Sequence, residues 1–413
     1  MTKKIDQIIE DVENSLRPFY LEREKITLIN QEKVLAAMQE EKLQAGDFHW
    51  TTGYGYGDDG RDKLEAIYSR VFATEDALVR PNIVSGTHAI FLCLEALLSP
   101  KDQLLSLCGP LYDTMQKAIG LTGKEALNLK SRGILYDEVP LKDGQMDPET
   151  FKNYINEDTK IAMIQRSTGY SNRRAFTIEE IQEAIAEVRK INPSIYIFVD
   201  NCYGEFTEVK EPTQVGADIM AGSLIKNPGG GLAYSGGYVV GREDLVHQVA
   251  NQLTAPGIGK ECGLSFGMTR QLAQGLFIAP HVVSEAMKGA LAFAKVFERL
   301  GYTCIPSSQD PRSDIIQSIR LEDPEKLEVF CQAIQAASPV DAHFTPMPWD
   351  MPGYEDQVIM AAGGFIEGSS IELSADGPMR DPYFVYFQGG LTYAHCILSL
   401  KKVLEEFANK DFI

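Results

Sequence analysis

The stretch ADIMAGSLIKNPGGGLAYSGGYVVG, from Ala217 to Gly241, guides the prediction of the fold. It contains two short apolar runs, at 217–224 and 236–241, with the length and composition of buried strands. Between them a single cation, Lys226, lies among small residues and precedes three consecutive glycines. Lys226 therefore either belongs to a tight turn, or the glycines keep space open around an amine that takes part in chemistry.

Strand-like runs alternate with helical patterns on the N-terminal side of this stretch. "KIAMIQ" at 160–165 precedes a helical pattern at Ile178–Arg189, and "SIYIFVD" at 194–200 follows it. This alternation predicts an α/β fold with a mostly parallel sheet flanked by helices. From about Tyr302 the pattern changes to the runs "IIQSIRL", "QVIMAAG" and "SSIELSA" with two helices, which predicts a smaller α+β unit.

We expect three parts in this chain of 413 residues, which is too long for one ordinary core. An N-terminal helical arm is predicted at 1–45, with helices at Ile5–Leu16 and Gln31–Leu43. A large α/β domain is predicted at 46–285 and a small C-terminal domain at 286–413.

Composition narrows the class of protein. The net charge is −19, which argues against nucleic acid or an anionic membrane as the main partner. The seven cysteines are scattered without a C-x-x-C pair, as in a reducing compartment, and the histidines show no metal-ligand spacing. The charged N-terminus has no signal-peptide core, and no run of about eighteen apolar residues suggests a membrane span. We therefore expect a cytoplasmic protein without a metal site.

Asp200 and Lys226 form the first candidate pair for chemistry. Asp200 ends a buried-type strand, at the edge where α/β sheets bind ligands, although such an aspartate can equally cap a turn. Lys226 is surrounded by apolar and small residues, which predicts a lowered pKa and a nucleophilic amine. Such a lysine forms a Schiff base with an aldehyde, and pyridoxal phosphate additionally needs a buried carboxylate at its ring nitrogen. The pair predicts this cofactor.

A phosphate site and a ring-stacking residue are also predicted. Ser85, Gly86 and Thr87 precede a helix, whose first N–H groups attract phosphate, although the same residues suit a plain N-cap. Ser223 can add a hydroxyl to the same phosphate. Tyr112 follows the next strand and can lie on the cofactor ring or simply pack there.

Together these motifs resemble the fold-type I pyridoxal-phosphate enzymes of cysteine and methionine metabolism, such as cystathionine β-lyase and methionine γ-lyase. "GYGYGDDGRDKLE", "VDNCYGEF", "SLIKNPGGGLAYSGGYVVG" and "GPMRDPYFVYFQGGLTY" are similar to a bacterial branch labelled aluminium-resistance protein or methionine γ-lyase. The resemblance implies that Lys226, Tyr112 and Asp200 are catalytic. It also implies that Ser85, Gly86, Thr87 and Ser223 bind the cofactor.

Two positions differ from the wider group. Ile225 stands where a threonine usually precedes the lysine, and Glu372 stands where an arginine usually binds the substrate carboxylate. Arg380 is the candidate replacement, because a guanidinium binds a carboxylate through two hydrogen bonds, although it can also be a surface residue.

The resemblance also implies a site shared between subunits. Tyr56 and Arg61 lie in the loop that reaches the partner's cofactor phosphate in the wider group, and Tyr54 beside them is a candidate substrate contact. Asn172 lies where polar residues face the cofactor or substrate there, or it is solvated. We therefore expect a homodimer or a homotetramer.

The predicted activity is a carbon–sulfur lyase. By β- or γ-elimination on cystathionine, cysteine or methionine, it would release a thiol, ammonia and a keto acid, with Lys226 as base and Tyr112 as proton donor. One alternative is an aminotransferase or another pyridoxal-phosphate enzyme of the same fold. Another is a non-catalytic protein that binds a metabolite or protects against metal stress.

Overall fold

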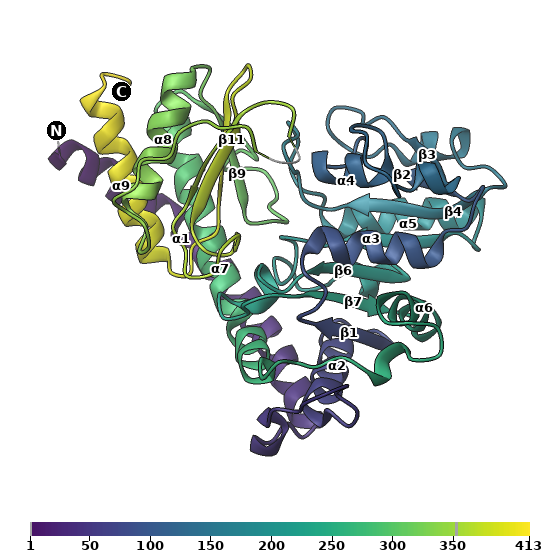
Figure 1. Cartoon of the computed structure of the whole chain (residues 1–413). Coiled ribbons are helices and arrows are strands. Elements are labelled where there is room, and N and C mark those ends of the chain that lie inside the picture. Colours follow the sequence, from purple (N-terminus) through teal and green to yellow (C-terminus); the bar gives the residue numbers. More distant parts are fainter. Residues whose placement is uncertain (1, 352–353) are drawn as a thin grey trace.

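A computed structural model describes residues 2–351 and 354–413 and shows two sheets with long helices alongside both (Figure 1). The first sheet has the strand order β1-β7-β6-β5-β4-β2-β3. Its strands are β1 Asp76–Arg80, β2 Gln103–Ser106, β3 Leu135–Glu138, β4 Thr159–Gln165, β5 Tyr196–Asp200, β6 Ile219–Ser223 and β7 Gly237–Gly241. β3, β2, β4, β5 and β6 pair in parallel, and β7 runs antiparallel between β6 and β1. The predicted α/β fold with a mostly parallel sheet is confirmed.

Helices pack on this sheet because strands buried on both faces need apolar cover. They are α2 Asp59–Val71, α3 Gly86–Leu97, α4 Asp113–Ile119, α5 Ile178–Ile191 and α6 Glu243–Leu253. α3 contacts β6, β7 and α6, whereas α2 contacts β1 and β7. Thr177 begins α5 with a capping box: its side chain accepts from the N–H of Glu180, whose carboxylate accepts from the N–H of Thr177.

The second sheet is antiparallel, with the order β10-β11-β12-β9-β8. Its elements are β8 Thr303–Ile305, β9 Ile316–Arg320, α8 Pro324–Ala336, β10 Val358–Ala362, β11 Ser374–Pro378, β12 Phe384–Gln388 and α9 Tyr393–Asn409. The strand expected in "SSIELSA" begins only at Ser374. Glu372 precedes it, and its carboxylate accepts from the N–H groups of Phe365 (2.6 Å) and Ile366 (2.8 Å), which ties the segment to a neighbouring loop.

The long helix α7, Thr269–Arg299, contributes to both hydrophobic cores. Leu276 and Val283 are buried in the core of the first sheet, and Phe293 and Phe297 in that of the second. Within the described residues, α7 is the one helix long and apolar enough to cross a membrane, yet 72% of its apolar window is buried inside the protein. Packing between the two sheets accounts for its apolar composition.

The N-terminal segment forms one helix, α1 Thr2–Glu40, so the prediction of two separate helices is wrong. Proline inside a helix costs a hydrogen bond and normally breaks it, but α1 continues through Pro18. Tertiary contacts on both sides of the proline explain this. Val12 packs in the second core and Val34 in the first, while Arg23 donates to the carbonyl of Thr207 at 2.6 Å.

Candidate functional site

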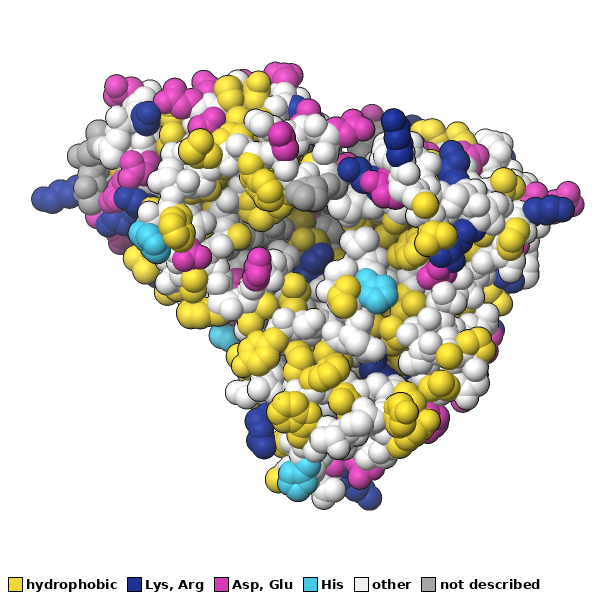
Figure 2. Space-filling model, in the orientation of Figure 1, with side chains coloured by type: hydrophobic (Ala, Val, Ile, Leu, Met, Phe, Trp, Pro, Cys, Tyr) yellow, Lys and Arg dark blue, Asp and Glu magenta, His cyan; other side chains and the backbone are white. Residues whose placement is uncertain are grey.

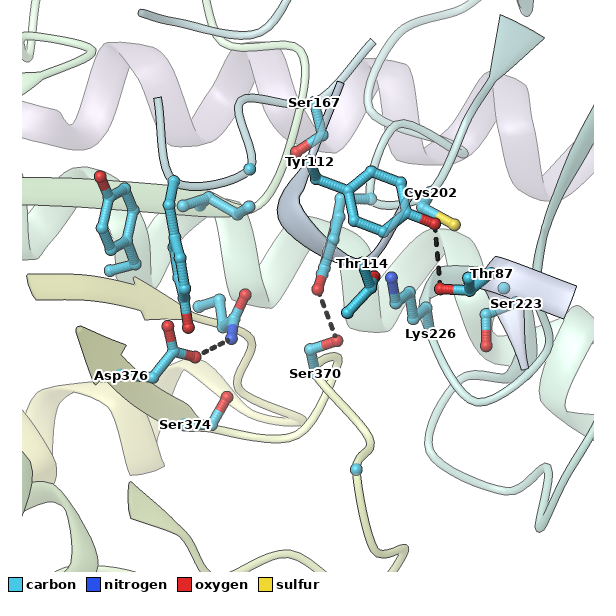
Figure 3. Close-up of a pocket in the computed structure, with 18 of the residues that line it drawn as sticks. Thr87, Tyr112, Thr114, Ser167, Cys202, Ser223, Lys226, Ser370, Ser374 and Asp376 are labelled. Carbon is cyan, nitrogen blue, oxygen red and sulfur yellow. Dashed lines mark hydrogen bonds between the residues drawn. The ribbon is translucent and has the colours of Figure 1, made fainter. Parts of the chain in front are cut away.

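A pocket of about 420 Å³ lies between the two sheets, and Figure 2 shows the molecular surface hollowed between its two lobes. Seven of the residues predicted for the site line this pocket, together with side chains from the second sheet. The seven are Ser85, Gly86, Thr87, Tyr112, Asp200, Ser223 and Lys226. Figure 3 shows several of them pointing into the cavity.

Parallel pairing brings the ends of β5 and β6 together. Asp200 ends β5 opposite Ala221 of β6, and Ser223 ends β6 two residues later. Asp200 is 4% exposed, and its Oδ1 accepts from the N–H of Cys202 at 3.0 Å. Burial raises the pKa of Asp200, and the charge of Lys226 partly offsets this rise. The carboxylate thus has both a local hydrogen bond and a cation within its electrostatic reach.

Lys226 follows β6 by three residues and is partly buried in the pocket. Its Nζ lies 3.9 Å from the ring centroid of Tyr203. Burial alone would lower the pKa of Lys226, but the surrounding groups of Cys202, Tyr203 and Asp200 outweigh it and raise the pKa above its ordinary value. The predicted lowered pKa is therefore wrong, because the pocket holds a carboxylate that favours the ammonium form.

The glycines after Lys226 do not surround its amine. A Cβ on Gly229 would lie 1.9 Å from the carbonyl oxygen of Leu224, and one on Gly230 would lie 2.6 Å from that of Gly275 in α7. Gly230 also has a φ of +53°, which most side chains disfavour. These glycines let a tight turn pack against α7. They position Lys226 indirectly, through the turn on which it lies.

The start of α3 forms the second corner of the pocket. The Ser85 hydroxyl accepts from the N–H of His88 at 3.0 Å, so this residue is indeed an N-cap. The N–H groups of Gly86 and Thr87 belong to the first turn of α3, where no preceding carbonyl can accept from them. A Cβ on Gly86 would lie 3.3 Å from Ser223 Cβ, which shows how closely the helix start approaches β6. Capping and phosphate binding are compatible here.

Tyr112 connects this corner with the rest of the pocket. Its hydroxyl donates to Thr87 Oγ1 at 2.9 Å (Figure 3), and its backbone N–H donates to Gln165 Oε1 at 2.9 Å. Burial and the nearby Asp200 raise the pKa of Tyr112 well above its ordinary value, so the phenol stays protonated near neutral pH.

The donor set fits pyridoxal phosphate in its chemistry. Free N–H groups and hydroxyls at Gly86, Thr87 and Ser223 suit a phosphate. Lys226 supplies an amine for an aldehyde, and Asp200 supplies a carboxylate for a protonated ring nitrogen.

Arg380 does not line this pocket. Its Nη1 pairs with Asp356 Oδ2 at 3.1 Å, and both residues line a smaller cavity that shares Asp113 and Tyr354 with the main pocket. Among the described residues no arginine lines the main pocket, and Lys226 is its one basic side chain. Within this chain Arg380 pairs with Asp356 outside the lining, and its assignment as the substrate-carboxylate ligand stays a prediction.

The other predicted contacts also lie outside the pocket of their own chain. Asn172 is exposed and is not part of the lining. Tyr54 and Tyr56 are 77% and 63% exposed. Arg61 is buried, and its Nη1 donates to the carbonyls of Gly55 (2.8 Å) and Gly263 (3.0 Å). Arg61 thus holds the loop that carries the two tyrosines.

The structure adds pocket residues that the sequence analysis did not single out. They come from the loops after β4 and β5, the segments before and after β10, and strands β11 and β12. They are Tyr170, Tyr203, Tyr354, Ser370, Ser374, Asp376, Tyr386 and Gln388. Two of them, Tyr386 and Gln388, lie in the stretch "GPMRDPYFVYFQGGLTY".

The fold and the pocket define a class of protein. The pyridoxal-5'-phosphate-dependent protein YhfS from Escherichia coli superposes with a TM-score of 0.64 at 15% identity, covering 94% of this chain and 97% of that chain. The architecture is that of the fold-type I pyridoxal-phosphate-dependent enzymes.

The methionine gamma-lyase family model matches residues 5–408, and the chain belongs to this family. It is 49% identical to a Listeria monocytogenes protein described as a "putative cystathionine beta-lyase involved in aluminum resistance", with a TM-score of 0.95 over 97% of this chain and 99% of that chain. It is also 50% identical to the uncharacterized protein YnbB of Bacillus subtilis (strain 168), over 98% of this chain and 96% of the relative. The resemblance to the aluminium-resistance branch is confirmed.

Proposed function

We propose that the protein is a pyridoxal-phosphate-dependent carbon–sulfur lyase that acts on a sulfur-containing amino acid. One observation carries the proposal: Lys226, Asp200 and the start of α3 line the same pocket. A family match to methionine gamma-lyase and a relative described as a cystathionine beta-lyase support the reaction class.

The pocket residues divide the work by chemistry. Gly86, Thr87 and Ser223 would hold the phosphate, Asp200 the ring nitrogen and Lys226 the aldehyde carbon. When bound, pyridoxal phosphate supplies an electron-poor ring that stabilises negative charge at the α-carbon of an amino acid. The Lys226 amine would remove the proton from that α-carbon.

Tyr112 would donate a proton to the departing sulfur. Its pKa is raised well above the ordinary value by burial and Asp200, so the phenol carries its proton at neutral pH. Breaking the carbon–sulfur bond then yields a thiol. Addition of one water to the remaining fragment yields ammonia and a keto acid, which balances the atoms of the reaction.

The test uses purified protein incubated with pyridoxal phosphate. We expect a yellow chromophore that borohydride fixes onto the peptide containing Lys226, and release of ammonia and a keto acid from cystathionine, cysteine or methionine. Lys226→Ala should lose both signals, whereas Lys160→Ala should keep them, because Lys160 lies in β4 outside the pocket lining. A keto acid formed without ammonia would indicate transamination and overturn the lyase assignment.

We also propose that Tyr54 and Tyr56 complete the pocket of a partner subunit. Two other exposed aromatic residues, Trp50 and Phe266, lie in the same region. The segment that contains Phe266 is close to both loops, because the N–H of Gly263 donates to the carbonyl of Tyr54 and Gly267 lies close to Trp50. Figure 2 shows hydrophobic side chains gathered on the lower end of the molecule, where α2 lies in Figure 1. An exposed patch of this kind suits a subunit interface.

Mixing two inactive variants tests this arrangement. Lys226→Ala and Tyr56→Phe should each lose activity as homodimers. After joint refolding, about a quarter of the sites should combine an intact lysine with an intact tyrosine. Absence of any recovery in mixed dimers would show that Tyr56 acts within its own chain or not at all.

A further inference from the structure

The wall of the pocket formed by the second sheet contains a buried carboxylate with no role in the reaction above. Asp376 in β11 is 5% exposed, and its carboxylate accepts from Gln388 Nε2 in β12 at 2.9 Å. Its Oδ1 has no partner with hydrogen-bond geometry among the described residues, and the phenol of Tyr170 lies close enough to lower the pKa of the carboxyl group. The neighbouring Ser374 is 6% exposed and its hydroxyl is likewise unpartnered within that part of the chain. Buried polar atoms are rarely left unpaired without a ligand or water.

Aromatic rings border this carboxylate. The ring centroid of Tyr170 lies 4.9 Å from that of Tyr386 and 5.5 Å from that of Tyr354, and all three residues line the pocket. Burial raises the pKa of Tyr170 and of Tyr386 above the ordinary value, so both rings remain neutral phenols. Faces of neutral tyrosine rings attract cations, and they pack against the methylene groups that lead to a cation.

The charged groups that line the pocket also favour a cationic ligand. Its lining contains the carboxyl groups of Asp113, Asp200 and Asp376 but, within the described residues, a single amine, that of Lys226. Lys226 and Asp200 influence each other electrostatically, whereas the groups that act on Asp376 are Tyr170 and Gln388, both uncharged at neutral pH. The far wall thus has a negative group, and a cation with an electrostatic effect on this wall, Arg380, acts on Tyr386 from outside the lining and pairs with Asp356.

The two ends of the pocket are separated. In Figure 3, Asp376 and Ser374 lie on the side opposite Thr87 and Ser223, with Lys226 between them but nearer to Thr87. A substrate whose α-carbon is placed near Lys226 can therefore extend its side chain away from the phosphate corner and toward Asp376.

We propose that the substrate carries a second cationic nitrogen group at the far end of its side chain, and that Asp376 binds it between Tyr170, Tyr354 and Tyr386. This inference rests on the proposed function, because it assumes that the α-amino group reaches Lys226. Asp376 and the three tyrosines act as specificity determinants. An amino acid with a neutral side chain leaves the buried Asp376 carboxylate with its hydrogen bond from Gln388 but without a cation.

The test compares L-lysine with L-norleucine as ligands of the pyridoxal-phosphate-loaded protein. Their side chains differ mainly at the end, which is an ammonium in one and a methyl group in the other, and neither contains a carbon–sulfur bond to eliminate. Binding is measured by calorimetric titration. We expect lysine to bind about tenfold or more tightly than norleucine, as a charge-assisted hydrogen bond in a buried site warrants.

The variants locate the effect. Asp376→Asn should bring the dissociation constants of lysine and norleucine close together, mainly because lysine binds more weakly. Tyr354→Leu should reduce the difference between the two dissociation constants only in part. Asp356→Asn is the matched control, because this carboxylate lies outside the pocket and pairs with Arg380. Equal or weaker binding of lysine to the unmodified protein would overturn the inference, even if the Asp376 variant fails to fold.

The inference and the proposed function fail in different ways. Ammonia release from neutral sulfur amino acids without a preference for lysine would keep the lyase and remove the cation site. Tight lysine binding that depends on Asp376, without elimination from any sulfur amino acid, would keep the cation site and remove the lyase.

Discussion

Replacing Gly230 by alanine tests whether the glycines after Lys226 serve the turn or the space around the amine. Gly230 has a φ of +53°, and a Cβ there would lie 2.6 Å from the carbonyl oxygen of Gly275 and 2.8 Å from Ile278 Cγ1. The left-handed conformation costs a non-glycine residue roughly 1–2 kcal/mol. The collision with backbone of α7 adds about 1–3 kcal/mol, since the two segments must move apart.

Gly257→Ala is the matched control for Gly230→Ala. Gly257 also has a positive φ, of +86°, but a Cβ there would meet nothing within 4 Å. It should therefore lose only the conformational part, roughly 1–2 kcal/mol. The free energy of unfolding is measured by urea denaturation, and both variants should keep the slope of the unmodified protein. If Gly230→Ala were no less stable than Gly257→Ala but could not bind pyridoxal phosphate, the glycines would serve the amine and our reasoning would be refuted.

Three further predictions concern single side chains. Tyr112→Phe removes the hydroxyl that donates to Thr87, so the protein should bind pyridoxal phosphate about fivefold less tightly, as equilibrium dialysis would measure. If Tyr112 is the proton donor, kcat should also fall, by a larger factor than cofactor affinity, as steady-state kinetics would measure. Arg380→Ala should leave KM unchanged, because this guanidinium pairs with Asp356 outside the pocket lining. A large rise in KM would instead indicate that Arg380 binds the substrate. Burial raises the pKa of Glu205 to about 8, so its contribution to stability is present below the unfolded value near 4.5 and is lost as the pH rises through 8. Glu205→Gln mimics the protonated form, so in melting experiments from pH 5 to 9 its stability relative to the unmodified protein should increase with pH and level off above about 8.

The strand-end residues were predictable because parallel pairing is a strong constraint. Buried apolar runs before Asp200 and Lys226 predicted parallel-sheet strands, and such strands place their carboxyl ends at one edge. The start of α3 was predictable for a similar reason, since Ser-Gly-Thr before an apolar helix indicates an N-terminus with free N–H groups.

The electrostatic and long-range features were not predictable from local pattern. The composition around Lys226 suggested a lowered pKa, but the groups of Cys202, Tyr203 and Asp200 together raise it, and the prediction considered burial alone. Asp376 lies in the strand "SADGP", whose small and polar residues lack an apolar alternation, so the preceding "SSIEL" appeared to be the better strand. The apolar spacing of the N-terminal segment predicted two helices, whereas contacts with two distant cores support one continuous helix α1.

The passage of α1 and α7 through both cores has a consequence for how the chain comes apart. Limited proteolysis should not release a stable half, because a cut near residue 285, inside α7, would sever a helix that both sheets share. Heating should likewise give one calorimetric transition, in which the van't Hoff enthalpy equals the calorimetric enthalpy of the whole chain. The two walls of the pocket would then fold and unfold together, as one cooperative unit.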